Sequence, residues 1–154
     1  MHELIARTDP KEIRMDALYT AEALATGGGR DGHVRTSDGQ LDLDLAVPKD
    51  MGGAGGAANP ELLFAAGYSA CFHGALQAVA RAEKAQLGES SVGAKVSIGS
   101  DGNGGFKLAV VLEVVIPDLP HGEAQALADK AHQVCPYSNA TRGNIEVEVN
   151  VVDD

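Results

Sequence analysis

The sequence is poor in cysteine and in basic residues, and both shortages restrict what the protein can do. Its 154 residues include two cysteines, Cys71 and Cys135. They are too few for a secreted disulfide scaffold, and their separation excludes a CxxC redox pair and a four-ligand zinc site. Twelve Lys and Arg against 22 Asp and Glu give a net charge of -10. Because this charge opposes binding to phosphate backbones and anionic lipid surfaces, we expect no nucleic-acid partner and no membrane partner.

Membrane and targeting signals are also lacking. No window approaches the ~20 uninterrupted apolar residues of a membrane span. The first residues, MHELIARTDPKEIRMD, mix acids and bases where a signal peptide needs an apolar stretch. A cytoplasmic protein is therefore predicted. A chain of this length can bury one ordinary core, so we expect a single domain over residues 1–154, with residues 1–17 as an N-terminal extension.

Histidines are present but scattered, and they form no HExxH motif or other close pair that would favour a metal site. We therefore predict no metal and no cofactor. The five histidines are His2, His33, His73, His121 and His132.

The N-terminal third reads as short strands separated by turns. Residues 41–47, LDLDLAV, alternate apolar and acidic side chains, which is typical of a strand with one wet face. The turn Ser37-Asp-Gly39 predicts a hairpin that joins this strand to residues 33–36. A further strand is predicted over residues 18–26. The glycine-rich residues 27–32 cannot hold a strand ladder, so Arg30 is expected in a loop.

A long helix is predicted next. The glycine-rich residues 51–58 lack the lysine of a P-loop and do not match GxGxxG, so no phosphate site is expected there. Asn59 fits an N-cap, Pro60 the first helical position, and Glu61 the positive end of the helix dipole. Apolar residues cover nearly every face from residue 62 to residue 80, which predicts a helix buried on most sides and ending near Gly88.

The remaining residues predict a hairpin, a helix and a last strand. The strands 92–100 and 106–116 flank the glycine turn 101–105. A helix over residues 122–134 is expected to stop at Pro136, and residues 145–151, IEVEVNV, alternate as a strand. This order predicts an α+β fold with a largely antiparallel sheet.

Cys71 lies within the apolar run FAAGYSACFHGAL, residues 64–76, and two interpretations are open. Free cysteine is among the most buried residue types, so the thiol can simply be packed and inert. A reactive thiol would need a cation, because desolvation in an apolar helix disfavours the thiolate. Candidate cations are Arg30, Arg142, His73 and His132. Cys135, at the predicted C-terminal end of a helix, would attack a peroxide poorly, but it could condense with a sulfenic acid on Cys71.

Four separated motifs resemble one known family. GGRDG at residues 28–32, GGAGG followed by NPE within residues 52–61, FAAGYSACF at residues 64–72 and HQVCPYSNATRGNI at residues 132–145 occur in order. Together they resemble the organic hydroperoxide resistance (Ohr) subgroup of the OsmC/Ohr family, from about residue 19 to residue 151. The resemblance implies an OsmC-like fold with a central buried helix in an intertwined homodimer, whose sites lie at the subunit interface.

The resemblance also implies an activity, thiol-dependent reduction of organic hydroperoxides, and a role for each site residue. Cys71 is then the peroxidatic cysteine and Cys135 the resolving cysteine. Arg30 activates the thiolate, and Glu61 holds the arginine. The implied reductant is a dihydrolipoyl protein or dihydrolipoamide. The chemistry is reasonable because an arginine can stabilise both the attacking thiolate and the leaving alkoxide without itself losing a proton.

Helix geometry constrains this assignment. On one unbroken helix, Glu61 and Cys71 would be about 15 Å apart. Either the helix breaks near Gly67, or Glu61 and also Arg30 reach Cys71 from the partner subunit, which is the arrangement we favour.

Apolar side chains near Cys71 would form a mouth that favours alkyl or aryl hydroperoxides over hydrogen peroxide. The same side chains can equally be ordinary core. They are Phe64, Tyr68, Phe72 and Leu76.

Two rival functions remain from the sequence. In a redox sensor or small-molecule-binding module, the same disulfide would change the protein's shape with little turnover. In a structural domain, both thiols would be inert.

Overall fold

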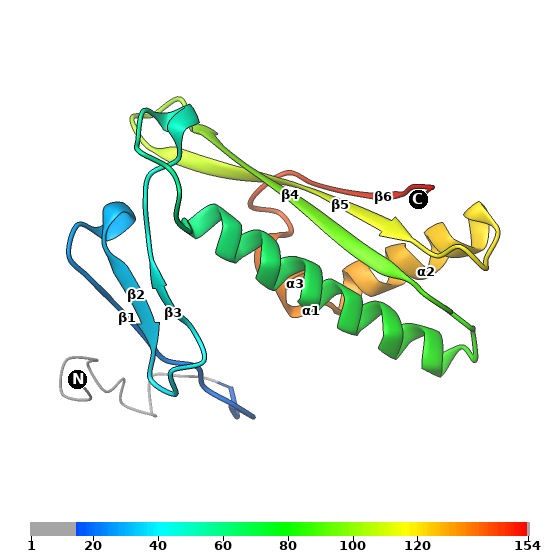
Figure 1. Ribbon diagram of the computed structural model, residues 1–154. Helices are drawn as coiled ribbons and strands as arrows, with labels where there is room; N and C mark the ends of the chain where they lie inside the picture. The colour runs from blue at the N-terminus through cyan, green and yellow to red at the C-terminus, as the bar shows by residue number, and fades with distance from the viewer. Residues whose placement is uncertain (1–14, 154) are drawn as a thin grey trace. The chain divides into compact units, whose positions relative to one another are not determined.

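The computed structural model describes residues 15–153, which divide into two compact units with the boundary in the chain between residues 60 and 61 (Figure 1). Residues 1–14 of the predicted N-terminal extension lie outside the described residues.

The N-terminal unit is built on a small antiparallel sheet of order β1-β2-β3. Its strands are β1 (Ala23–Thr26), β2 (His33–Thr36) and β3 (Asp42–Asp44). The β2–β3 hairpin confirms the prediction. Its turn is fixed by the Asp38 carboxylate, which accepts hydrogen bonds from Thr36 Oγ1 at 2.7 Å and from the Gln40 amide at 2.9 Å. The strand predicted from residue 18 begins only at Ala23, and the strand predicted over residues 41–47 covers only Asp42–Asp44.

The loop between β1 and β2 contains a 3₁₀ turn, Gly29–Asp31, which includes Arg30. A Cβ at Gly32 would lie 2.1 Å from the Thr26 carbonyl oxygen, so only glycine fits at that position. The Asp31 carboxylate accepts a hydrogen bond from the Val47 amide at 2.9 Å. A second 3₁₀ turn covers Lys49–Met51.

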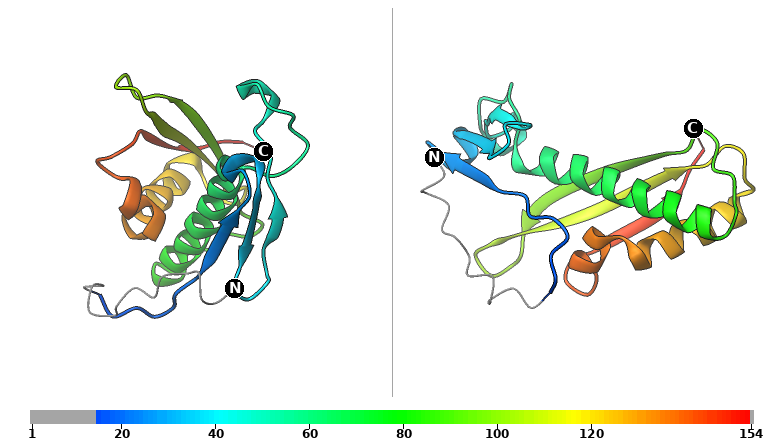
Figure 2. Two further views of the ribbon diagram at one scale, coloured as in Figure 1. Left: turned by 90° about the vertical axis from the view of Figure 1, so that its left-hand side faces the viewer. Right: turned by 90° about the horizontal axis from the view of Figure 1, so that it is seen from below.

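The C-terminal unit is a three-stranded sheet with helices on one face (Figures 1 and 2). Strands β4 (Ser91–Ser100) and β5 (Phe106–Val115) form the predicted antiparallel hairpin. Strand β6 (Val147–Val151) pairs with β5 in parallel, because α2 (His121–Val134) carries the chain back between them. The long helix α1 (Pro60–Ala82) and the short α3 (Pro136–Thr141) complete the unit. The predicted α+β class is confirmed, with one parallel pair that the sequence did not predict.

The core lies between the sheet and the helices α1 and α2. Alternate side chains of β5 face the helices, and Val110, Leu112 and Val114 are at most 1% exposed. The register places Val96 of β4 opposite Val110, and Val147 of β6 beside it. The helices supply the other fully or almost fully buried apolar side chains: Tyr68, Phe72 and Leu76 from α1, and Ala124, Leu127, Ala128 and Ala131 from α2.

Helix α1 begins at Pro60 as predicted, but it is less buried than expected. The buried positions Tyr68, Phe72, Leu76 and Ala80 form one stripe with a spacing of four residues. Leu62, by contrast, is 56% exposed. The helix is also long and apolar enough, by length and composition alone, to cross a membrane. The expectation that no segment approaches the length and composition of a membrane span was therefore too broad. A helix in the core of a folded protein can have the same length and the same apolar composition as a membrane span.

Helix α1 also ends earlier than predicted, in a Schellman motif. The Ala85 amide donates to the Ala80 carbonyl at 2.9 Å, and the Lys84 amide donates to the Arg81 carbonyl at 3.2 Å. Lys84 takes the left-handed conformation, with φ of 58°. Gly88, which was expected to end the helix, instead lies beside the Asp118 carboxylate in the following loop.

Candidate active site

Cys71 and Cys135 meet in the C-terminal unit. Cys71 lies on α1 and is half-buried, whereas Cys135 lies between α2 and α3 and is 0% exposed. Both thiols are free, and the Cys135 thiol donates to the Cys71 sulfur at an Sγ–Sγ distance of 3.6 Å. A disulfide has an S–S length of about 2.05 Å, so the sulfurs would need to approach by about 1.5 Å. The two sulfurs are therefore close enough for a disulfide to form after a small movement.

The surroundings of Cys71 act on its pKa in opposite directions. Burial of the thiol raises the pKa of Cys71, the hydrogen bond with the Tyr137 backbone amide lowers it, and the hydrogen bond and charge interaction with Cys135 raise it; the net direction is upward. No cation acts on this pKa within the described part of the C-terminal unit. The thiol would therefore need a positive charge from elsewhere to be ionised at neutral pH.

Tyr137 lies against α1 because Gly67 leaves room for its ring. A Cβ at Gly67 would lie 2.9 Å from the Tyr137 hydroxyl oxygen. The Tyr137 ring packs against Tyr68, with centroids 5.6 Å apart, and against Phe64, with centroids 6.1 Å apart. Tyr137 is 40% exposed. An aromatic cluster thus lies beside the sulfur pair, with Tyr137 exposed, Phe64 partly buried and Tyr68 fully buried.

Buried hydroxyl groups tie the three helices together next to Cys135. Ser138 Oγ lies 2.8 Å from the Tyr68 hydroxyl oxygen and 2.8 Å from His132 Nδ1. The Tyr68 hydroxyl also lies 3.0 Å from Thr141 Oγ1. Since Tyr68, Ser138 and His132 belong to α1, α3 and α2 respectively, one small cluster fixes all three helices.

The four side chains that were candidate cations for Cys71 have different surroundings in the structure. His132 is mainly neutral at neutral pH, because burial first and then the Arg142 charge lower the pKa of its imidazole. Arg142 donates to the His132 carbonyl at 2.5 Å and to Asn139 Oδ1 at 3.0 Å, so it stabilises the end of α3. His73 Nε2 lies 2.9 Å from Ser90 Oγ. Arg30, in the N-terminal unit, stays the predicted cation.

Glu61 lies in the first turn of α1, and α1 is unbroken from Pro60 to Ala82. The alternative of a helix break near Gly67 is therefore wrong. Ten residues of continuous helix separate Glu61 from Cys71, which corresponds to about 15 Å. The roles of Glu61 and Arg30 stay predictions.

The four residues predicted to line the substrate mouth lie at different depths. Tyr68, Phe72 and Leu76 are 0% exposed and belong to the core, while Phe64 is partly buried at its edge. Their role in substrate binding stays a prediction.

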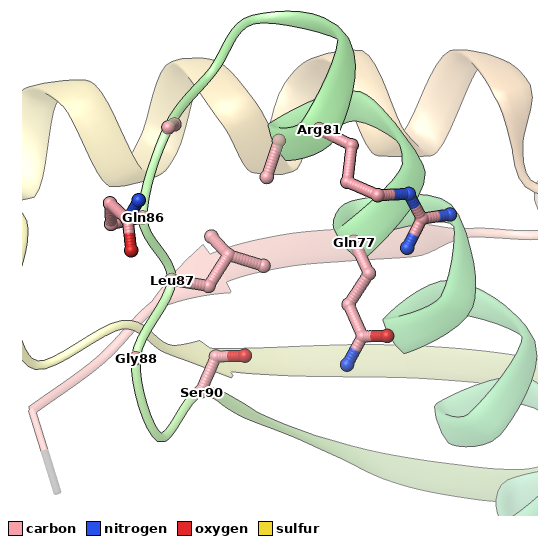
Figure 3. A pocket seen from close by; sticks show the side chains of 8 residues that line it. Gln77, Arg81, Gln86, Leu87, Gly88 and Ser90 are labelled. Atoms are coloured by element: carbon pink, nitrogen blue, oxygen red, sulfur yellow. The ribbon is translucent and has the colours of Figure 1, made fainter.

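A shallow cavity of about 270 Å³ lies elsewhere, where α1 ends and the chain turns toward β4 (Figure 3). Gln77, Arg81 and Leu87 are among its lining residues. Arg81 follows Cys71 by ten residues, about 15 Å along the helix, so this cavity does not include the thiols. No cluster of His, Cys, Asp or Glu suited to a metal ion occurs among residues 15–153.

Reasoning from the sequence missed α3 and the residues it supplies. Pro136 was taken as a helix stop, whereas it occupies the first position of α3, where proline is favoured. The polar run YSNAT after this proline was the available signal for Tyr137, Ser138 and Thr141.

Comparison with known proteins gives consistent matches. A sequence model of the family OsmC, described as OsmC-like protein, matches residues 53–150. An organic hydroperoxide resistance protein of Xanthomonas axonopodis pv. citri is 54% identical over 136 residues, which are 87% of this chain and 94% of that protein.

Solved structures agree in fold and in sequence. An organic hydroperoxide resistance protein from Legionella pneumophila has a TM-score of 0.85 and 54% identity, covering 88% of this chain and 98% of that chain. One from Elizabethkingia anophelis, with crystallant-derived thiocyanate bound, has a TM-score of 0.86 and 55% identity, covering 91% and 100%.

Proposed function

The chain belongs to the OsmC-like protein family, and from this premise we propose that it is a thiol-dependent peroxidase that reduces organic hydroperoxides to alcohols. The observation that carries the proposal is the contact of the two thiols, with Sγ atoms 3.6 Å apart in a chain that has no other cysteine. The names of relatives that match most of the chain support the substrate class.

The proposed cycle has three steps that balance. The Cys71 thiolate attacks the hydroperoxide, the O–O bond breaks, and the products are a Cys71 sulfenic acid and, after protonation, an alcohol. The Cys135 thiol then attacks the sulfenic sulfur, forming the disulfide and releasing water. A dithiol such as dihydrolipoamide, free or carried on a protein, reduces the disulfide by exchange and is itself oxidised. No metal or cofactor is needed.

Ionisation of Cys71 is assigned to Arg30. Burial raises the pKa of Cys71, and a guanidinium a few ångströms away would lower it. A Glu61 carboxylate bound to this guanidinium would orient it by charge-assisted hydrogen bonds. Because about 15 Å of helix separates Glu61 from Cys71, we propose that Arg30 and Glu61 act on the thiol of the partner subunit in a homodimer.

This arrangement is tested by mixing inactive chains. Cys71→Ser chains and Arg30→Ala chains should regain activity as heterodimers, since one of the two sites then has both groups. Cys71→Ser with Cys135→Ser is the matched control and should show no rescue, because the two sulfurs belong to one chain. Absence of rescue in verified heterodimers of the first pair would contradict the shared site.

The substrate is proposed to carry an apolar group. Phe64 and Tyr137 are the aromatic side chains of the cluster that keep exposed surface beside α1. Each buried methylene of a substrate contributes about 0.8 kcal/mol, so cumene and lipid hydroperoxides should react faster than hydrogen peroxide.

The two thiols suit the cytoplasm, where cysteines are kept reduced, and we propose that location. Steady consumption of cumene hydroperoxide with dihydrolipoamide tests the function. Oxidation of the thiols without turnover would instead favour a redox sensor.

A further inference from the structure

Ser138 occupies an unusual position for a serine, because its hydroxyl connects the two other helices of the C-terminal unit. The side chain is 0% exposed, and its oxygen contacts Tyr68 on α1 and His132 on α2 at 2.8 Å each. Serine in a helix usually faces water or bonds to its own backbone. Here the hydroxyl instead forms hydrogen bonds with side chains of α1 and α2.

The contact between Tyr68 and Ser138 lies next to the contact between the sulfurs. Tyr68 precedes Cys71 by three residues on α1, and Ser138 follows Cys135 by three residues at the start of α3. Tyr68 and Cys71 share a face of α1, because residues three apart on a helix do so. Cys135 is the residue directly before α3, and both contacts, Tyr68 with Ser138 and Cys71 with Cys135, join this segment to α1. The hydroxyl pair and the sulfur pair are therefore successive contacts between the same two segments, and the first constrains the separation of the second.

The hydrogen bonds of this cluster can all form at the same time. Thr141 Oγ1 donates to the Ser138 carbonyl at 3.3 Å, so it can accept from Tyr68. Tyr68 then accepts from the Ser138 hydroxyl, and Ser138 accepts from His132 Nδ1, which carries the proton in this arrangement. Every hydroxyl donates once and accepts once. Removing the Ser138 hydroxyl would leave the Tyr68 hydroxyl and His132 Nδ1 each short of a buried partner and would weaken the attachment of α3 to α1.

We propose that Ser138 is a positioning residue for disulfide formation, holding Cys135 within reach of the Cys71 sulfur through its contacts with Tyr68 and His132. The role rests on the proposed function, in which the Cys135 thiol attacks the Cys71 sulfenic acid and water leaves. Ser138 itself exchanges no proton or electron with the reacting atoms. It limits how far the segment that carries Cys135 can move from α1.

The test measures the effective concentration of Cys135 toward Cys71, from the equilibrium of the Cys71–Cys135 disulfide with reduced and oxidised dithiothreitol. The effective concentration falls when the two sulfurs are held less well within bonding reach of each other, so Ser138→Ala should lower it by about tenfold or more. Tyr68→Phe removes the same contact from the other side, together with the contact of the Tyr68 hydroxyl with Thr141 Oγ1, and should act in the same direction. Ser97→Ala, on an exposed position of β4, is the matched control and should change nothing.

A merely structural role predicts a different result. Ser138→Ala would then lower the free energy of unfolding while the effective concentration in the folded protein stays within about twofold of wild type. That result in both Ser138→Ala and Tyr68→Phe would overturn the proposal, as would a wild-type protein that forms no Cys71–Cys135 disulfide in the redox buffer. If Ser138→Ala does not fold, Tyr68→Phe decides alone.

Peroxide turnover is measured separately. A wild-type protein that forms the disulfide in dithiothreitol but consumes no hydroperoxide would contradict the proposed function, whereas the equilibrium with dithiothreitol would still decide the role of Ser138. In turnover assays the positioning role predicts a lower kcat for Ser138→Ala at an unchanged kcat/KM for dihydrolipoamide when disulfide formation limits the rate, because the dithiol reacts only after the disulfide has formed.

Discussion

The Sγ atoms of Cys71 and Cys135 lie 3.6 Å apart although 64 positions separate the two residues in sequence. One sulfur is carried by the middle of α1, and the other by the junction of α2 and α3. Because Cys135 is 0% exposed and Cys71 is half-buried, a peroxide from solvent reaches Cys71 more readily. The order of attack in the proposed cycle follows from this difference.

Substitution of the resolving cysteine should stop the cycle after one oxidation. In Cys135→Ser the sulfenic acid on Cys71 has no thiol to condense with, so we expect a single turnover and an added oxygen atom on Cys71 in intact-mass measurements. Cys71→Ser should show neither. A Cys135→Ser protein that turns over as fast as wild type with dihydrolipoamide would show that the second cysteine is not needed.

Removing the proposed cation should shift the pH dependence of peroxide reduction. Burial raises the pKa of Cys71, so Arg30→Ala should move the pH profile of the rate to higher pH and lower the rate at neutral pH by at least about tenfold. Arg30→Lys keeps the charge and should retain part of the rate. Stopped-flow oxidation of Cys71 measures this, and an unchanged profile in Arg30→Ala would contradict the role of Arg30.

His33 should make the stability of the N-terminal unit depend on pH. Hydrogen bonds to Asp44 first and to Asp42 next raise the pKa of His33 in the folded chain. A raised folded pKa contributes stability that is fully present below about pH 6.5, the unfolded value, and is lost as pH rises through the folded value.

We expect hydrogen-exchange protection of β2 and β3, corrected for intrinsic rates, to fall over this range of pH. His33→Gln should flatten the dependence. If protection instead rises with pH in the wild-type protein, the two contacts of His33 do not act as described.

Glycine at position 84 should stabilise the protein. Lys84 takes a left-handed conformation at the end of α1, which costs a non-glycine residue about 1–2 kcal/mol, and part of the gain is offset by the greater freedom of glycine in the unfolded chain. We expect Lys84→Gly to raise the free energy of unfolding by about 0.5–1 kcal/mol in urea titrations. Lys84→Ala keeps the Cβ and should show no such gain; equal effects of the two would refute the strain at this position.

Segments with a periodic apolar pattern, and segments bounded by glycine or proline, could be predicted from the sequence. The alternation of residues 41–47, the glycine turn of residues 101–105 and the proline at position 60 each determine structure through local sterics and burial, so the two hairpins and the start of α1 were found. The parallel partner of β6 depends on where α2 returns the chain, which no local pattern in IEVEVNV specifies.

The site was predictable only in part, for two physical reasons. Proline both ends and begins helices, so Pro136 alone did not reveal α3. Ser138 bonds to Tyr68, which lies 70 positions earlier in the sequence, and to His132, which lies six positions earlier. Such contacts leave no periodic signal in the sequence. The pairing of Cys71 with Cys135 was implied by family resemblance; the fold brings their sulfurs to 3.6 Å, and the disulfide stays a prediction.

The central claim is tested most directly by titrating the fully reduced protein with cumene hydroperoxide, counting the remaining thiols and mapping the disulfide by mass spectrometry. The account predicts that each equivalent of hydroperoxide removes both thiols of one chain and yields one equivalent of alcohol and a Cys71–Cys135 disulfide. Thiols that survive an excess of hydroperoxide, or a disulfide that joins cysteines of different chains, would contradict it.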